Sequence, residues 1–197
     1  MPRVDPLKRE EVPELEDVFR IKEQTLGFVP NSALTLARWP DLARSYRQLS
    51  AAVASTRYLS TDLMELVFLM ASMAGGCRYC QAHSAYVGRS IGIPQAKLDD
   101  VWTFESSSLF SDAERAALRL ALAAGSHPPM VTDRHFDDLR LYYDDNAIVE
   151  VVGVISFAGF MNRWNDTLGT PLEEGPLAVA EEDLRKLGWE AGVHISD

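Results

Sequence analysis

The chain has 197 residues, of which 47% are hydrophobic and 24% are charged, as in an ordinary globular protein with a sizeable core. Its 29 acidic and 19 basic residues give a formal charge of -10, which repels phosphate backbones and anionic lipids, so we expect no nucleic-acid or membrane partner. The charged, proline-containing segment 1–14 lacks the apolar stretch of a secretory signal, and we therefore expect a cytoplasmic protein.

Apolar residues recur at helical spacing along almost the whole chain, and glycines and prolines fall between these stretches, which predicts an all-α fold. The first helix is predicted over residues 13–26, with Gly27 as its stop. Asn31 is expected to cap a short helix that Pro40 ends, and Asp41 to begin the next helix.

Further helices are predicted downstream from apolar repeats that follow polar capping residues. They cover residues 60–73, a segment from 77 onward, 111–124, 132–143, 146–164 and 177–187. Gly75 and Gly76 separate the first two of these segments. Ser111 and Glu114 have the spacing of a capping box.

An internal echo appears when residues 65–80 are aligned with residues 150–165. A glutamate then begins both segments, and the two cysteines of the first fall on Asn162 and Asn165 of the second. This pattern suggests a degenerate duplication in which only the first copy kept its thiols. We expect one all-helical domain over residues 1–197, a compact bundle with a core motif at 45–95 and a second half-repeat at about 111–174.

Cys77 and Cys80 are the only cysteines, and they lie too close in sequence to staple distant parts of a fold, which predicts reactivity. At a helix start, free backbone amides and the positive end of the helix dipole stabilise a thiolate, and Arg78 would add positive charge. Residues three apart on a helix have Cβ atoms about 5 to 6 Å apart, whereas a relaxed disulfide prefers about 3.8 Å. A bond between these sulfurs should therefore be easily reduced.

Two further side chains belong to this constellation. On a helix His83 would flank Cys80 and not Cys77, where a neutral imidazole could take the thiol proton, although an ordinary hydrogen-bonded histidine is an equal interpretation. Glu65 follows Asp62 by three positions, which by itself predicts half of a helix cap. Zinc is disfavoured, because the chain has no third cysteine and only four histidines, and we expect no metal and no cofactor.

The arrangement of Glu65, eleven intervening residues, Cys77-Arg-Tyr-Cys80 and a histidine closely resembles the signature of the alkylhydroperoxidase D-like proteins, within the carboxymuconolactone decarboxylase superfamily. Residues 160–165, followed by Leu168 and Gly169, resemble a later segment of its peroxidase-related branch. The resemblance covers most of residues 45–174. It implies an all-helical homo-oligomer that reduces hydroperoxides through a cysteine pair.

The same resemblance implies roles for individual residues. Cys80 would attack the peroxide, and Cys77 would resolve the product while exposed to an external dithiol reductant, either a dihydrolipoyl group or a thioredoxin-like protein. Glu65 and a histidine would form a proton relay. The relay histidine of the family usually follows the second cysteine by four positions, where this chain has Ser84, and His83 comes one position early.

Geometry sets a condition on that relay. Twelve residues of unbroken helix would separate Glu65 from Cys77 by about 18 Å. We therefore predict a turn at Gly75 and Gly76 that brings Glu65 closer to His83 and Ser84 than to the thiols.

The leading hypothesis is a thiol-dependent oxidoreductase in which the Cys80 thiolate attacks a hydroperoxide, becomes a sulfenic acid and is captured by Cys77 as a disulfide. One alternative is a general dithiol-disulfide oxidoreductase with poor peroxide kinetics. Another is a redox sensor or adaptor without turnover. A lyase on the same scaffold, against which the cysteine pair argues, and an inactive helical scaffold are the remaining alternatives.

Overall fold

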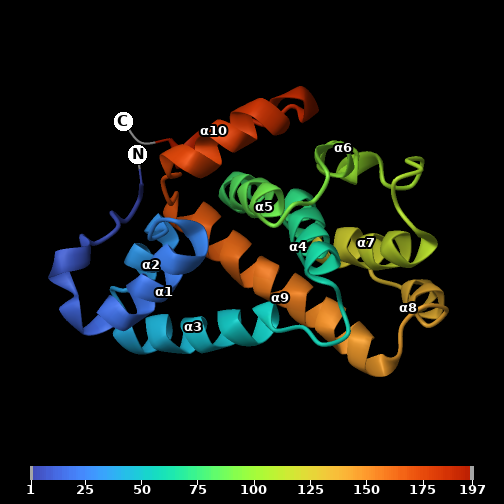
Figure 1. Ribbon diagram of the computed structural model, residues 1–197, viewed down its shortest axis with the longest axis horizontal. Coiled ribbons are helices and arrows are strands. Elements are labelled where there is room, and N and C mark those ends of the chain that lie inside the picture. The colour runs from blue at the N-terminus through green and yellow to red at the C-terminus, as the bar shows by residue number, and fades with distance from the viewer. Residues whose placement is uncertain (1, 196–197) are drawn as a thin grey trace.

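The computed structural model describes residues 2–195, and every regular element within that range is a helix (Figure 1). The predicted all-α class is therefore confirmed. Four helices form the centre of the fold: α4 (Thr61–Gly75), α5 (Arg78–Ser90), α7 (Asp112–Gly125) and α9 (Asp145–Leu168). Helix α4 packs against the other three, and its residues between Leu63 and Ser72 are almost all buried.

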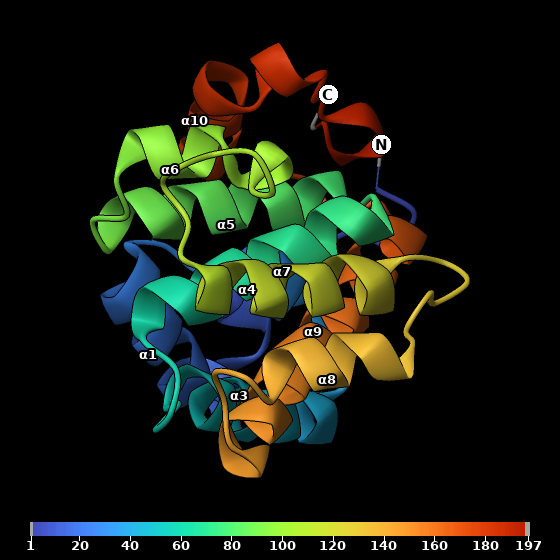
Figure 2. The same ribbon diagram turned by 90° about the vertical axis from the view of Figure 1, so that its right-hand side faces the viewer.

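The remaining helices surround this centre. Helix α10 (Glu174–Asp183) covers the outer side of α5, and seen from the end the helices stack in layers from α10 through α5 and α4 to α9 and α3 (Figure 2). The N-terminal helices α1 (Glu16–Leu26), α2 (Asn31–Leu36) and α3 (Pro40–Ala54) flank one end of α9. Two short helices, α6 (Gln95–Asp99) and α8 (Asp133–Leu139), lie toward the other end, near α7. Single 3-10 turns occur at Arg9–Glu11, Pro13–Leu15, Val101–Thr103, Arg185–Leu187 and Gly192–His194.

Helix ends with a strong local signal lie where they were predicted. Ser111 and Glu114 form the capping box of α7, and Gly27 ends α1 with a left-handed φ of 85°. Other boundaries were wrong. Pro30 precedes α2 as its N-cap, and Pro40 begins α3 instead of ending α2, because proline loses no hydrogen bond at a first helical position.

The ends of the last helices also moved. Helix α8 stops at Leu139, short of the predicted 143, and α9 continues to Leu168, beyond the predicted 164. Helix α10 begins at Glu174 and ends at Asp183, where 177–187 had been predicted, because the chain then tightens into a 3-10 turn closed by Gly188.

Helix α9 has 24 residues and is long and apolar enough, by length and composition alone, to cross a membrane. One of its faces is buried against α3, α4, α5 and α7, which is the environment of a core helix. The opposite face leaves Val149 70% exposed, with Val152 and Phe160 also exposed. The homo-oligomer stays a prediction, and this uncovered face is where we expect a second copy to pack.

Candidate active site

The turn between α4 and α5 sets the geometry of the candidate site. Gly76 ends α4 with a φ of 78°, a left-handed conformation that residues with a Cβ avoid, and the chain reverses there. Helix α5 then lies back along α4. The predicted turn is confirmed, and it places the cysteine pair at the start of α5.

Cys77 is the N-cap of α5, and its Sγ accepts a hydrogen bond from the backbone N–H of Cys80 at 3.3 Å. Both cysteines are free thiols, with exposed fractions of 0% for Cys77 and 2% for Cys80. The expectation that Cys77 is exposed to a reductant is therefore wrong, because Met161, Leu172 and Trp189 belong to the cluster packed around it. Burial raises the pKa of the Cys77 thiol well above its usual value. Burial thus disfavours the predicted thiolate at Cys77.

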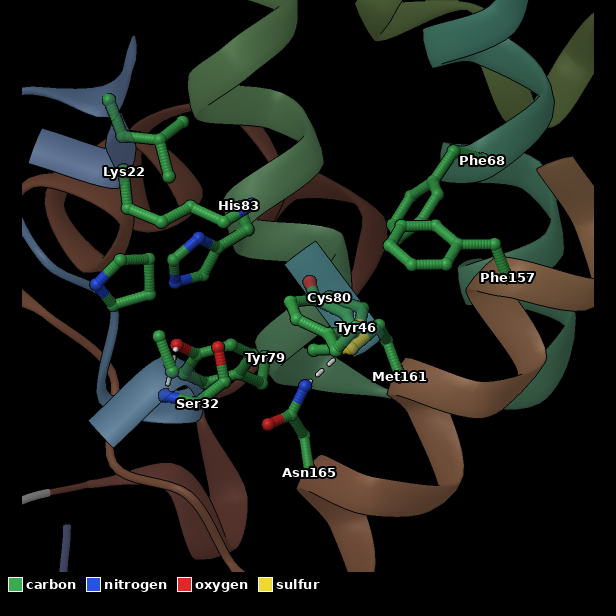
Figure 3. A pocket seen from close by; sticks show the side chains of 13 residues that line it. Lys22, Ser32, Tyr46, Phe68, Tyr79, Cys80, His83, Phe157, Met161 and Asn165 are labelled. Carbon is green, nitrogen blue, oxygen red and sulfur yellow. Dashed lines mark hydrogen bonds between the residues drawn. The ribbon is translucent and has the colours of Figure 1, made fainter. Parts of the chain in front are cut away.

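Cys80 borders a cavity of about 90 Å³ (Figure 3). Aromatic side chains contribute much of its wall, and among the described residues the wall includes Cys80 and not Cys77. The aromatic residues are Tyr46, Phe68, Tyr79 and Phe157. Asn165 on α9 points its amide at the sulfur, with Nδ2 donating to Sγ at 3.5 Å (Figure 3). The amide of α9 thus contacts the sulfur that borders the cavity.

Glu65 lies in a second cavity, of about 230 Å³, that shares His83, Tyr46, Phe68 and other side chains with the first. Its carboxyl oxygen accepts a short hydrogen bond from the hydroxyl of Ser84. Burial raises the pKa of Glu65 to about 7, and the bond from Ser84 only partly opposes this shift. The predicted proximity of Glu65 to Ser84 is confirmed.

His83 pairs with a residue that the sequence did not indicate. Its Nε2 lies 2.6 Å from Glu173 Oε2, and the other carboxylate oxygen of Glu173 accepts from the Tyr79 hydroxyl at 2.9 Å and from the backbone N–H of Asn31. Burial acts to raise the pKa of Glu173, but its hydrogen bond to His83, the charge of that imidazole and the Asn31 N–H outweigh burial and hold the pKa below its ordinary value. The ring of Tyr79 stacks on His83 with centroids 4.3 Å apart. The imidazole is thus fixed at the cavity wall.

Lys22 of α1 lines both cavities. Its Nζ donates to Ser50 Oγ at 3.1 Å and lies 5.4 Å from the centre of the Tyr46 ring. Burial lowers the pKa of this lysine. A cationic side chain therefore lies in an otherwise largely apolar and aromatic wall.

One group of potential metal ligands occurs among the described residues, and it includes the first cysteine. The Sγ of Cys77, a carboxylate oxygen of Asp166 and a ring nitrogen of His194 all lie within 4.8 Å of one another. The sequence argument against zinc did not foresee these neighbours, because Asp166 and His194 are distant from the cysteine pair along the chain.

The four predicted site residues lie on two adjacent helices, with Glu65 on α4 and Cys77, Cys80 and His83 on α5. Glu65 contacts Ser84, while His83 contacts Glu173, so the predicted carboxylate and imidazole belong to separate pairs. Their chemical roles stay predictions.

Sequence reasoning missed several side chains of the site: Lys22, Asn165, Asp166, Glu173 and His194. The internal echo did align Asn165 with Cys80, and Lys22 stood on the apolar side of its helix, which is an available signal for a buried lysine. Glu173 lies just before α10 and His194 ends a 3-10 turn, so helical periodicity gave no signal for either.

Comparison with known proteins adds to this geometry. The model of the carboxymuconolactone decarboxylase family matches residues 40–123. The ligand-free structure of the debrominase Bmp8 is 36% identical, with a TM-score of 0.86, over 91% of this chain and 96% of Bmp8. The chain belongs to the carboxymuconolactone decarboxylase and alkylhydroperoxidase D-like superfamily. The resemblance stated from the sequence is confirmed.

Other relatives in the superfamily are more distant or match over a shorter stretch. A peroxidase-related protein of Ralstonia eutropha JMP134, described as having an alkylhydroperoxidase AhpD core, is 22% identical with a TM-score of 0.79 over 89% of this chain and 94% of its own, which shows the shared fold. The uncharacterised protein YnjA of Escherichia coli K12 is 35% identical over 77 residues, which span 39% of this chain and only 42% of YnjA.

A second Bmp8 structure, of a variant in which a cysteine is replaced by alanine, contains 2,3,4-tribromopyrrole and is 35% identical to this chain with a TM-score of 0.86. The superfamily thus includes an enzyme that is similar to this chain over nearly its whole length.

Proposed function

We propose that this protein is a thiol-dependent oxidoreductase that reduces organic hydroperoxides at Cys80 and stores the oxidising equivalents as a Cys77–Cys80 disulfide. The observation that carries the proposal is the unequal placement of the two sulfurs. Cys80 borders the aromatic cavity, whereas Cys77 lies behind it in the same helical turn, buried and bonded to the Cys80 backbone. One sulfur can meet a substrate while the other can meet only its neighbour.

The reaction follows from this order. The Cys80 thiolate attacks the terminal peroxide oxygen, the O–O bond breaks, and the alkoxide takes a proton and leaves as an alcohol. Cys77 then loses its thiol proton and displaces hydroxide from the Cys80 sulfenic acid, which gives a disulfide and water. An external dithiol returns two electrons and restores both thiols.

The side chains around the cavity support these steps. The Asn165 amide stabilises charge on the Cys80 sulfur, and His83, held by Glu173, lines the same cavity where the leaving alkoxide needs a proton. Glu65 has a pKa of about 7, so that it carries a proton in part of the protein near neutrality and can exchange it through Ser84. Glu65, through Ser84, and His83 thus supply protons from different positions on α5.

The wall of the cavities indicates an organic substrate with an apolar or aromatic body, and Lys22 favours one that also carries a carboxylate. Lys22→Met should raise KM for a fatty-acid hydroperoxide roughly tenfold, the loss expected for one charge-assisted hydrogen bond, and change KM for cumene hydroperoxide much less. Initial rates with both substrates check this, with the exposed Lys8→Met as the matched control. Equal losses on the two substrates would contradict a carboxylate contact.

A second candidate is reductive removal of a halogen from an aromatic ring. The observation that favours it is the similarity to the debrominase Bmp8 over 96% of that protein, together with the aromatic wall beside Cys80. The electron balance is the same, because two thiols become a disulfide while the carbon–halogen bond is replaced by a carbon–hydrogen bond and halide leaves. The two candidates differ only in the electrophile that reaches Cys80.

Thiol counting with two kinds of oxidant separates these candidates. Reduced protein mixed with cumene hydroperoxide should lose two thiols per chain within the first turnover and yield one equivalent of alcohol. The same protein with a brominated pyrrole should release little bromide. If the brominated pyrrole sample releases bromide rapidly and the peroxide sample keeps its thiols, the function is dehalogenation and not hydroperoxide reduction. Two-thiol loss with a small disulfide alone would instead indicate the dithiol-disulfide exchanger.

A further inference from the structure

A second histidine–carboxylate pair, His194 and Asp166, lies beside Cys77, whereas His83 lines the cavity of Cys80. His194 is buried, with 1% of its surface exposed. Its Nδ1 lies 2.7 Å from the backbone oxygen of Thr170, and its Nε2 lies 3.1 Å from Asp166 Oδ1. Carbonyl and carboxylate oxygens only accept hydrogen bonds, so both contacts are satisfied together when both ring nitrogens carry a proton. Both ring nitrogens of His194 therefore face hydrogen-bond acceptors.

This pair lies next to the sulfur that the hydroperoxide cavity does not reach. The Cys77 Sγ, the Asp166 carboxylate and a His194 ring nitrogen are within 4.8 Å of one another. The Asp166 side chain is 41% exposed and lines a surface pocket on its outer side, so it connects the buried imidazole with water. Cys77 itself has no exposed surface. These two side chains therefore offer a polar path between Cys77 and solvent.

Cys77 needs such a path in both halves of the cycle. When the disulfide forms, the Cys77 thiol must give up a proton, and when the disulfide is reduced at Cys80, Cys77 leaves as a thiolate in a fully buried site. A thiolate buried without a cation or a proton donor is costly. His83 lines the cavity of Cys80 and is hydrogen-bonded to Glu173, and among the described residues neither side chain forms a hydrogen bond with Cys77.

We propose that His194, held by Asp166, is the proton donor and acceptor of Cys77, a role that rests on the proposed dithiol chemistry. During reduction an external thiolate attacks the Cys80 sulfur, the S–S bond breaks, and the His194 imidazolium transfers its proton to the leaving Cys77 sulfur. The products are a mixed disulfide on Cys80, a neutral Cys77 thiol and a neutral imidazole, so charge and atoms balance. During oxidation the same proton returns to His194.

Nε2 of His194 and Oδ1 of Asp166 are 3.1 Å apart, which is a hydrogen-bond distance. Other groups face the pair from neighbouring segments. They are the ring of Tyr79, 5.9 Å from the His194 ring, and Arg3, His127 and Arg163, which share the surface pocket with Asp166.

Reduction of the oxidised protein tests this assignment without any peroxide. The chain is converted to its disulfide with diamide, and its reduction by dithiothreitol is followed by stopped-flow fluorescence from pH 6 to 9, with rates normalised to the dithiothreitol thiolate. In the wild type the normalised rate should fall as pH rises, because His194 loses the proton that it donates. In His194→Gln the profile should be flat, and the rate at pH 6 should be at least about tenfold lower, at the low end of general acid catalysis.

Asp166→Asn keeps an acceptor for Nε2 but removes its charge, so its profile should keep the wild-type shape and shift to lower pH, because a protonated imidazole loses a neighbouring negative charge. Because Asp166 is partly exposed, this variant decides the matter if His194→Gln does not fold. His127→Gln, in the same surface pocket, is the matched control and should follow the wild type.

A wild-type profile in both variants would overturn the proposal, as would one equivalent of zinc in the purified chain that is lost in His194→Gln. Failure of peroxide turnover with these pH profiles intact would refute the hydroperoxide activity alone, so the two failures are distinguishable.

Discussion

Cys80→Ser should abolish hydroperoxide reduction, lowering kcat/KM by at least about a thousandfold, because a serine hydroxyl at this position is a far weaker nucleophile than a thiol. Of the two cysteines only Cys80 borders the cavity, so we expect that Cys77 cannot substitute for it. Stopped-flow measurement of peroxide consumption by the reduced variant checks this expectation.

Cys77→Ser is the matched control, since it removes a sulfur from the same turn. Its first turnover should stay within a few-fold of the wild type, yield a sulfenic acid that a dimedone probe traps, and stop after one equivalent of peroxide. The opposite result, in which the Cys80 variant reacts and the Cys77 variant does not, would reverse the assigned roles.

Glu65→Gln should change how the stability of the fold depends on pH. Burial raises the pKa of Glu65 from 4.5 to about 7 in the folded chain, so between these values the unfolded chain ionises while the folded chain keeps its proton. The free energy of unfolding therefore falls as pH rises through this window. A shift of this size corresponds to about 3 kcal/mol, and Glu65→Gln, which keeps an acceptor for Ser84, should lack that loss. Urea unfolding at pH 4, 5.5 and 8 measures the difference.

Glu150→Gln is a control with the opposite sign. Burial acts to raise the pKa of Glu150, but the backbone N–H groups of Arg57, Tyr58 and Leu59 outweigh burial and hold the pKa below its ordinary value. Its contribution to stability is present above the unfolded pKa and is lost as pH falls. Glu150→Gln should thus destabilise the fold at pH 8 more than at pH 4.

Parallel pH curves for the wild type and Glu65→Gln would show that Glu65 does not titrate as a buried carboxyl.

Local signals in the sequence were enough to predict where helices with strong capping residues begin or end. Ser111 and Glu114 fixed the start of α7, and the turn after α4 followed from adjacent glycines. The signals failed where a residue has two opposite uses, as Pro40 does, since proline both ends a preceding helix and begins a new one. Helix α6 has five residues and was not predicted, because periodicity needs two or more turns to show.

The candidate site was predictable only where its residues are close in sequence. Cys77, Cys80 and His83 share one helix, and a short turn returns the chain to Glu65. Glu173 and His194 reach α5 from the C-terminal segment through tertiary packing, and no spacing rule links positions about a hundred residues apart. The placement of His83 at the Cys80 cavity and of His194 beside Cys77 therefore arises from tertiary packing.

The burial of both sulfurs limits which external dithiols can reduce a Cys77–Cys80 disulfide. With at most 2% of either cysteine exposed, a donor whose thiols sit on a broad, rigid surface cannot touch the disulfide. We expect a narrow dithiol on a long flexible tether, such as a dihydrolipoyl arm, to reach Cys80 through its cavity more readily. We expect the width and length of the group that carries the donor's thiols, more than its reduction potential, to decide which reductants this protein accepts.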